Sequence, residues 1–189
     1  LSACLAEKGK KVLAIDMDPQ GNTTSGFGVD KNGIENTLYE LLLGEAETKD
    51  TIVKDVVENL DLIPSNINLS GAEIELVGID DKEFILKGIT DKLRRKYDYI
   101  ILDCPPSLNM LTINALTAAT SVLVPIQCEY YALEGLSQLI HTIDLVKERL
   151  NKRLKMEGVV FTMYDARTNL SLQVVENVKE NLNQNNYST

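Results

Sequence analysis

The length, composition and charge of the chain exclude several classes of protein. Its 189 residues, of which 44% are hydrophobic, are enough for one compact domain with a substantial core. No run of 18 apolar residues occurs, so we expect no stable insertion into a membrane. The net charge of −9 argues against broad attraction to nucleic acid but leaves room for a local basic patch. The three cysteines form no C-x-x-C pair, which excludes a zinc knuckle, argues against a disulfide framework and favours a reducing cytoplasm.

Short apolar runs alternate with helical patterns along the chain. The first eight residues have the pattern of the second half of a helix, and strands are predicted at 12–15, 60–63, 99–102, 122–126 and 159–162. Helices are predicted at 74–77, 84–95, 110–119, 133–150 and 172–182. Because the strand runs are continuously apolar, the strands should be buried on both faces, as in a parallel sheet. The sequence therefore predicts an α/β fold, a doubly wound and mostly parallel sheet with helices on both faces, in a single domain over 1–189.

Acidic side chains follow two of the predicted strands. Asp16 and Asp18 lie in "DMDPQGNTT" after the strand at 12–15, and Asp103 begins "DCPPS" after the strand at 99–102. Ligands of open parallel sheets bind beyond the carboxyl ends of the strands, so the three carboxylates should converge there. Close carboxylates repel unless a cation or hydrogen bonds offset their charge, which indicates Mg²⁺ with phosphate oxygens. The alternative is that each aspartate only caps the helix that follows it.

Two segments around these aspartates resemble a known family. "KKVLAIDMDPQGNTTSGFGV" and "YDYIILDCPPSLNMLTINAL" are similar to the nucleotide-responsive segments of the ParA/Soj chromosome and plasmid partition ATPases, a deviant Walker-A class of P-loop proteins. "VLVPIQCEYYALEGLSQLI" and "GVVFTMYDARTNLSLQVVENV" resemble the same family in the same order, so the similarity covers essentially the whole chain. The resemblance implies a three-layer P-loop NTPase fold with ATP and Mg²⁺ as ligands.

The resemblance also implies partners and a location. It predicts an ATP-dependent homodimer that binds nonspecific DNA and a ParB/Spo0J-like centromere-binding protein. ATP binding would drive dimerisation and DNA association, and hydrolysis would reset the cycle. The expected location is the bacterial cytoplasm, in association with the nucleoid.

The resemblance assigns roles to the three strand-end aspartates. Asp18 matches the position that orients or activates the attacking water, a role that a carboxylate within hydrogen-bonding distance can perform. Asp16 would lie deeper and support the metal and the phosphate-binding lysine. Asp103 ends its strand in the Walker-B manner and should hold Mg²⁺ through its water shell.

Further positions follow from the same resemblance. A first switch loop would respond to the γ-phosphate and consist of Gln20, Gly21, Asn22, Thr23 and Thr24. A second would consist of Pro105, Pro106 and Ser107. The nucleotide base is expected near Met163, Tyr164 and Asp165. Arg167 matches an arginine used for nonspecific DNA contact, and the alternative is an ordinary loop arginine.

The phosphate-binding loop G-x-x-x-x-G-K-[ST] does not occur in these residues. In the family that loop immediately precedes the helix whose tail would be the first eight residues, and a last strand and helices follow the segment that ends the chain. The resemblance therefore implies an internal fragment truncated at both ends. ATP hydrolysis is expected of the full-length parent, and the fragment alone is expected to be inactive.

Two other functions are compatible with parts of the sequence. A regulatory nucleotide switch or binding protein of the same fold, without ATPase activity and similar to MinD or to a transcription-regulating relative, would keep the strand ends and lose the phosphate loop. A phosphotransferase or phosphatase of the haloacid dehalogenase class also begins with D-x-D after a strand. That class places Thr or Val two residues after the second aspartate, where this chain has Gln20, so it is disfavoured.

One basic run remains outside these assignments. "KERLNKRLK" contains five basic residues from Lys147 to Lys155. Such a run is typical of a solvated helix end whose cations complement the helix dipole. Contact with DNA is the alternative.

Overall fold

The computed structural model describes residues 1–129 and 132–184. The chain divides into two compact units, Leu1–Ala118 and Ala119–Thr189. Tyr130 and Tyr131, in one of the segments that resemble the ParA/Soj family, lie outside the described residues. Within the described ranges, the structure contains no helix of the length and apolarity that crossing a membrane requires.

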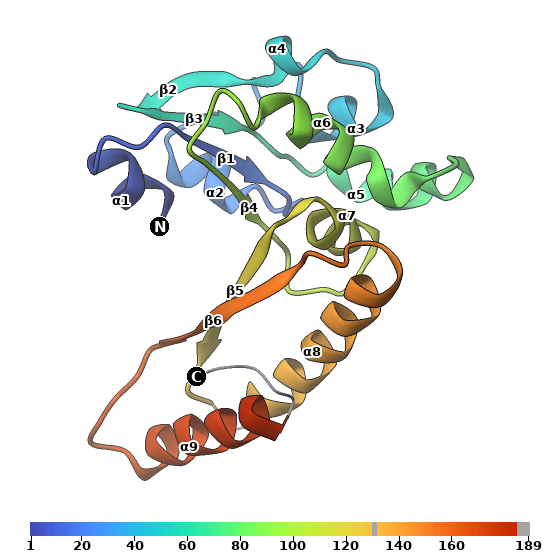
Figure 1. The fold of residues 1–189 in the computed structure, drawn as a ribbon. Helices are drawn as coiled ribbons and strands as arrows, with labels where there is room; N and C mark the ends of the chain where they lie inside the picture. The colour runs from blue at the N-terminus through green and yellow to red at the C-terminus, as the bar shows by residue number, and fades with distance from the viewer. Residues whose placement is uncertain (130–131, 185–189) are drawn as a thin grey trace. The chain divides into compact units, whose positions relative to one another are not determined.

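The first unit is built on a four-stranded sheet with the order β2-β3-β1-β4 (Figure 1). Its strands are β1 (Val12–Asp16), β2 (Val53–Val57), β3 (Leu60–Ile63) and β4 (Tyr99–Asp103). β1 pairs in parallel with both β3 and β4, whereas β2 pairs antiparallel with β3. The helices of this unit are α1 (Ser2–Glu7), α2 (Asn22–Gly26), α3 (Leu38–Leu43), α4 (Thr48–Thr51), α5 (Leu69–Glu75), α6 (Ile85–Leu93) and α7 (Met110–Ala118), with 3-10 helices η1 (Leu76–Gly78) and η2 (Lys82–Phe84).

The central strand β1 is buried on both faces because helices cover both sides of the sheet. Leu13 and Ile15 pack into a core cluster with residues of α3, α5, α6 and α7. Val12 and Ala14, which point to the opposite face, pack with Ala6 of α1 and with β3. Consecutive side chains of a strand alternate between faces, so a continuous apolar run is what a strand covered on both sides requires.

Local signals in the sequence set the bounds of α3. The hydroxyl of Thr37 accepts a hydrogen bond from the Tyr39 N–H at 3.3 Å, and the Thr37 N–H donates to the Glu40 carboxylate at 2.7 Å. This reciprocal capping box satisfies donors that the first turn of a helix leaves unpaired. At the other end Gly44 has φ 76°, the left-handed conformation in which glycine commonly ends a helix.

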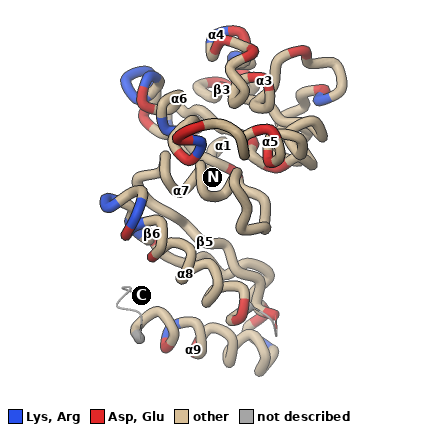
Figure 2. The backbone as a smooth tube through the Cα atoms, turned by 90° about the vertical axis from the view of Figure 1, so that its right-hand side faces the viewer, with Lys and Arg blue, Asp and Glu red and all other residues tan. Residues whose placement is uncertain are grey.

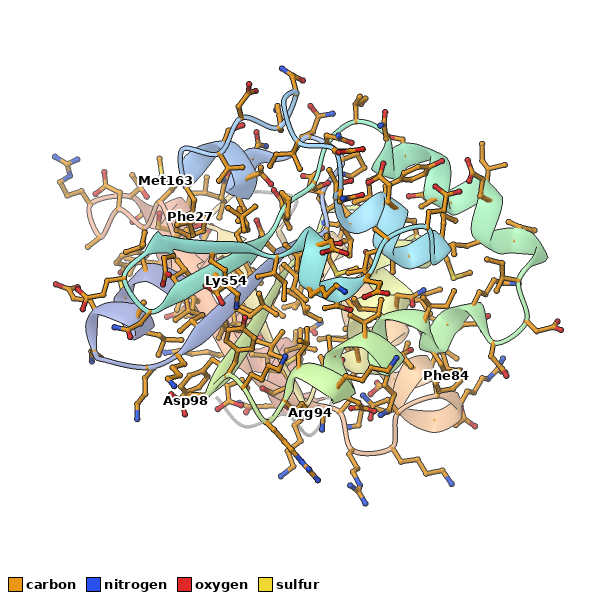
Figure 3. The ribbon with its side chains drawn as sticks, turned by 90° about the horizontal axis from the view of Figure 1, so that it is seen from above. Phe27, Lys54, Phe84, Arg94, Asp98 and Met163 are labelled. Carbon is orange, nitrogen blue, oxygen red and sulfur yellow. The ribbon has the colours of Figure 1, made fainter. Side chains whose placement is uncertain are left out.

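β2 is an irregular strand at one end of the sheet order. Its pairing with β3 shifts register between Val53 and Val57, and Asp55 has φ 52°. Lys54, labelled in Figure 3, donates to the carboxylate of Asp61 on β3 at 2.5 Å. The same carboxylate accepts a hydrogen bond from the Tyr97 hydroxyl at 2.5 Å and another from the Asp55 N–H at 2.9 Å. Two of these three donors, Lys54 and the Asp55 N–H, belong to β2, so this buried carboxylate ties β2 to β3.

The second unit has a two-stranded parallel sheet with two long helices. The strands are β5 (Ser121–Gln127) and β6 (Lys155–Thr162), and the helices are α8 (Ala132–Arg149) and α9 (Asn169–Gln184). Val124 and Ile126 of β5 pack with Leu136 of α8 and with Val174 and Val178 of α9. The apolar spacing of both helices therefore faces the sheet, as their amphipathic pattern predicts.

The predicted α/β class and the predominantly parallel pairing are confirmed. Each predicted strand lies inside an observed strand. The sequence did not predict β2, α3 or the short helices α2 and α4. β2 was not predicted because Lys54 and Asp55 interrupt its apolar pattern. The strand also pairs antiparallel at the edge of the sheet, where a continuous apolar run is not required. That residues 1–189 form a single domain remains a prediction.

Candidate functional site

Asp16 is a fully buried carboxylate at the carboxyl end of β1. One of its oxygens accepts hydrogen bonds from both the N–H and the hydroxyl of Thr24, each at 2.7 Å. The other accepts from the Asp18 N–H at 3.2 Å. Burial raises the pKa of Asp16, and the hydrogen bonds from Thr24 and Asp18 oppose that increase. The side chain thus holds the loop after β1 against the start of α2.

Ser65, which the sequence pattern did not single out, joins this network from the loop that follows β3. Its N–H donates to the Thr24 hydroxyl at 2.9 Å, and its own hydroxyl donates to the carbonyl of Asp18 at 2.8 Å. Ser65 and Thr24 are both fully buried. The signal was present in "IPSN", because β3 is parallel to β1 and its polar residues end at the same edge of the sheet.

Asp18 is half-buried, and the loop that follows it is tightly turned. One carboxylate oxygen of Asp18 accepts from the Gln20 N–H at 2.9 Å, and its carbonyl accepts from the Gly21 N–H at 2.9 Å. Gly21 has φ 62°, and a Cβ added there would lie 2.8 Å from the carbonyl oxygen of Ser65. Glycine is therefore required at this position by both conformation and space. Lys31 closes the loop by donating to the Gln20 carbonyl at 2.6 Å.

Asp103 lies beside Asp16, since the two residues are register partners on the parallel strands β4 and β1. The hydroxyl of Thr23 donates a hydrogen bond to the Asp103 carboxylate. The Met17 N–H donates to the Asp103 carbonyl at 2.8 Å. The first predicted switch loop and the end of β4 are therefore in direct contact, as the sequence predicted for one shared edge.

The second predicted switch loop follows β4 directly. Pro105, Pro106 and Ser107 link β4 to α7. The Ser107 carbonyl accepts from the Thr112 hydroxyl at 2.6 Å, and the Asn109 amide donates to the Ser107 hydroxyl at 3.0 Å. These contacts anchor the far end of the loop to the first turn of α7, while its prolines restrict the end next to Asp103.

The carboxylates do not form a direct metal-binding cluster. Among residues 1–129 and 132–184, no group of three or more His, Cys, Asp or Glu side chains is arranged to hold a metal ion. Both carboxylate oxygens of Asp16 accept hydrogen bonds from the protein, which fits a supporting role better than direct coordination of the metal ion. Asp103 is exposed at the strand end, which fits contact with Mg²⁺ through water. The metal roles of Asp16 and Asp103 remain predictions.

The remaining predicted residues belong to the second unit. Met163 and Tyr164 follow β6 and are 82% and 46% exposed, and Met163 has φ 54°. Asp165 accepts two hydrogen bonds from the guanidinium of Arg167, at 2.9 and 2.8 Å. These bonds lower the pKa of Asp165. The base-binding role of the first three residues and the DNA-binding role of Arg167 remain predictions.

Comparison with curated proteins and a family model gives consistent matches. A family model described as an AAA domain matches residues 1–156. The sporulation initiation inhibitor protein Soj of Bacillus subtilis is 55% identical over 189 residues, which are 100% of this chain and 75% of that protein. The chromosome partitioning protein ParA of Myxococcus xanthus is 52% identical over 179 residues, 95% of this chain and 63% of that protein.

Solved structures of similar fold include a cobyrinic acid a,c-diamide synthase from Mycobacterium smegmatis with a bound ATP analogue and magnesium. It has a TM-score of 0.90 and 41% identity, covering 95% of this chain and 73% of that one. A plasmid partition protein from Borrelia burgdorferi has a TM-score of 0.80 and 31% identity, covering 94% and 76%.

The parallel sheet, the strand-end aspartates and these structural neighbours define an α/β protein of the P-loop ATPase class. Because its sequence is 55% identical to Soj and 52% identical to a chromosomal ParA, the chain belongs to the ParA/Soj family of chromosome-partitioning ATPases. The resemblance stated from the sequence is confirmed.

Proposed function

We propose that the full-length protein is a Mg-ATP-dependent partition ATPase. ATP binding drives its dimerisation and its association with DNA, and hydrolysis, promoted by a ParB-like centromere-binding partner, resets the cycle. Such a protein acts as a switch, so the change of state matters more than the amount of product.

The observation that carries the proposal is the hydrogen bond from Thr23 to Asp103. It connects the loop after β1 to the carboxylate at the end of β4, the two places where a γ-phosphate and its metal would be sensed. A ligand that competes for either partner would break this hydrogen bond. The buried hydrogen bonds among Asp16, Thr24 and Ser65 hold the segment that carries Thr23 in place.

The chemistry assigned to each residue follows from its contacts. Bound Mg²⁺ would neutralise charge on the phosphates. Asp103 is placed to accept hydrogen bonds from water molecules around that ion. Asp18 keeps one carboxylate oxygen without a protein donor among the described residues, while its other oxygen is fixed by Gln20. A carboxylate held in this way can orient a water molecule for attack.

Substitution of Asp18 in the full-length protein tests the proposal. Asp18→Ala and Asp18→Asn should leave binding of Mg-ATP within a few-fold of the unmodified protein and lower turnover by about 100-fold, the lower range for loss of a general base. Asp30→Ala is the matched control, because Asp30 is an exposed aspartate shortly after α2 whose carboxylate accepts a hydrogen bond from the Asn32 N–H of its own turn.

The measurements are phosphate release at saturating ATP and nucleotide affinity by fluorescence. Turnover of both Asp18 variants within about threefold of the parent would remove Asp18 from catalysis. Absence of phosphate release by the unmodified full-length protein, with ATP bound, would instead support the regulatory nucleotide switch.

A further inference from the structure

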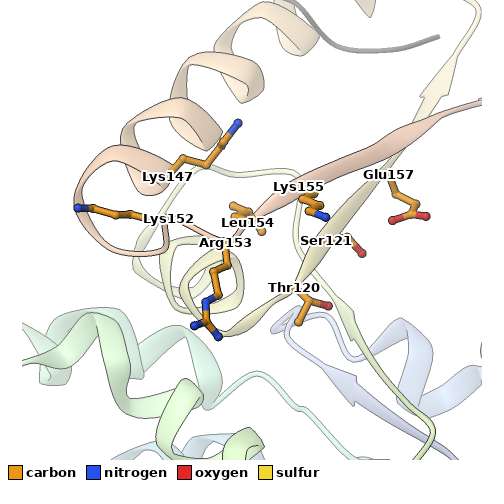
Figure 4. A pocket seen from close by; sticks show the side chains of 8 residues that line it. All are labelled: Thr120, Ser121, Lys147, Lys152, Arg153, Leu154, Lys155 and Glu157. Carbon is orange, nitrogen blue, oxygen red and sulfur yellow. The ribbon is translucent and has the colours of Figure 1, made fainter.

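The basic run predicted between Lys147 and Lys155 surrounds a cavity in the second unit. The cavity has a volume of about 700 Å³ and is lined by Thr120, Ser121, Lys147, Lys152, Arg153, Leu154, Lys155 and Glu157. Figure 4 shows the four basic side chains spreading around its rim, and Figure 2 shows basic residues gathered where α8 leads into β6. Among the described residues that line it, Glu157 alone is acidic. The cavity is thus a positive site on a chain whose net charge is −9.

The helix dipole explains only part of this charge. Lys147 and Arg149 lie in the last turn of α8, where cations interact favourably with the helix end. Lys152, Arg153 and Lys155 lie beyond the last helical residue, and the dipole effect falls off within one turn. All three are exposed, and no acidic residue of the described chain forms an ion pair with any of them. Neither the helix dipole nor an ion pair therefore offsets their positive charge, and it is available to an anionic ligand.

The turn that carries these residues is firmly held. The Asn151 N–H donates to the Val146 carbonyl at 2.7 Å, and the Asn151 amide donates to the Ala119 carbonyl at 2.8 Å. Leu154 is buried, and the Lys155 N–H donates to the Thr120 carbonyl at 3.1 Å. The backbone under Lys152 and Arg153 is consequently fixed before any ligand arrives, which lowers the entropic cost of binding.

The lining favours phosphate groups of a nucleic-acid backbone. Lysine, arginine and hydroxyl side chains are the usual phosphate contacts, and this cavity offers Thr120 and Ser121 beside its cations. No aromatic ring occurs among its described lining residues, so it provides no platform for stacking an exposed base. Leu154, its apolar residue, is buried and cannot insert into a lipid surface. Contact with the backbone of duplex DNA requires cations and hydroxyl groups but neither a stacking platform nor an exposed apolar residue, and it therefore fits this lining.

We infer that Lys152, Arg153 and Lys155 form a second DNA-backbone contact of the protein, separate from Arg167. The inference rests on the proposed function in that DNA is taken as a partner. Lys155 begins β6, Thr162 ends the strand roughly 23 Å further along it, and Arg167 lies in the loop beyond that end. One turn of duplex DNA spans about 34 Å, which is longer than the strand between the two contacts.

The test measures binding of the full-length protein, with Mg²⁺ and a non-hydrolysable ATP analogue, to a short mixed-sequence DNA duplex over a series of salt concentrations. The pocket variant is Lys152→Ala with Arg153→Ala. The control variant, Lys8→Ala with Lys10→Ala, removes the same charge from exposed positions of the first unit. A third variant is Arg167→Ala. ATP turnover of each is measured alongside.

The pocket variant should lower the slope of log affinity against log salt by about two units, roughly 0.9 for each phosphate that is no longer neutralised, without a change in turnover. The control variant should leave the slope within about half a unit. If Arg167→Ala lowers the slope and the pocket variant leaves it unchanged, this inference is wrong, whereas the proposed association with DNA still holds.

Two other outcomes also oppose the inference. If the unmodified protein binds no duplex, both this inference and the proposed DNA association are wrong. If the pocket variant loses binding of polyglutamate and keeps the DNA salt slope, the cavity receives an acidic polypeptide.

Discussion

Replacing Thr24 by valine tests the buried network that supports the candidate site. Valine has the shape of threonine, so the change removes only the hydroxyl. That hydroxyl donates to Asp16 at 2.7 Å and accepts from the Ser65 N–H at 2.9 Å, and all three residues are buried. Losing a hydrogen bond to a charged group costs about 1.5–3 kcal/mol, and leaving the Ser65 N–H unpaired costs about 1–3 kcal/mol. We expect Thr24→Val to lower the free energy of unfolding by about 3–5 kcal/mol.

Thr24→Ser is the matched control, because it keeps the hydroxyl and removes one methyl group at a cost of about 1 kcal/mol. The assay is urea unfolding of the full-length proteins followed by circular dichroism, with the slope on denaturant compared to confirm that the unfolding transition is the same. The valine variant should be less stable than the serine variant by about 2 kcal/mol or more. Equal stability of the two variants would refute the reasoning that Thr24 links Asp16 to β3.

Two further predictions concern Gly21 and Asp61. Gly21→Ala should lower the free energy of unfolding by about 2 kcal/mol, because a left-handed residue gains a Cβ that meets the Ser65 carbonyl, whereas Gly26→Ala, with open space around it, should have little effect in the same urea assay. Burial tends to raise the pKa of Asp61, but hydrogen bonds from Lys54 and its other donors outweigh burial and lower it. The stabilisation is therefore present above the unfolded pKa of about 3.9 and is lost as pH falls through the lower folded pKa. Asp61→Asn should flatten the decline of unfolding free energy measured below about pH 4, and an unchanged decline would contradict this assignment.

The parts of the fold that could be predicted from the sequence are those in which one strong signal dominates. β1 and β4 are continuous apolar runs that end in aspartate, so both the strands and the shared edge that brings Asp16 and Asp103 together could be inferred. β2 could not, because it pairs at the edge and carries charges where the apolar pattern would continue.

Side-chain partners were harder to predict than strand ends. Thr24 was expected in a loop that senses phosphate, but nothing in the sequence indicates that its hydroxyl bridges Asp16 and Ser65. The position of Ser65 after a strand could have indicated the shared edge of the sheet, but not its hydrogen-bond partners. These contacts depend on the register of β1 against β3, which a single sequence does not determine.

The irregularity of β2 has a consequence for solubility. A regular strand at the border of a sheet offers unpaired N–H and C=O groups to other chains and can seed aggregation. Here the register shift and the left-handed Asp55 break that row of groups, and Lys54 adds a charge held by Asp61. The irregularity of β2 therefore makes this edge of the sheet a poor template for pairing with a strand from another molecule.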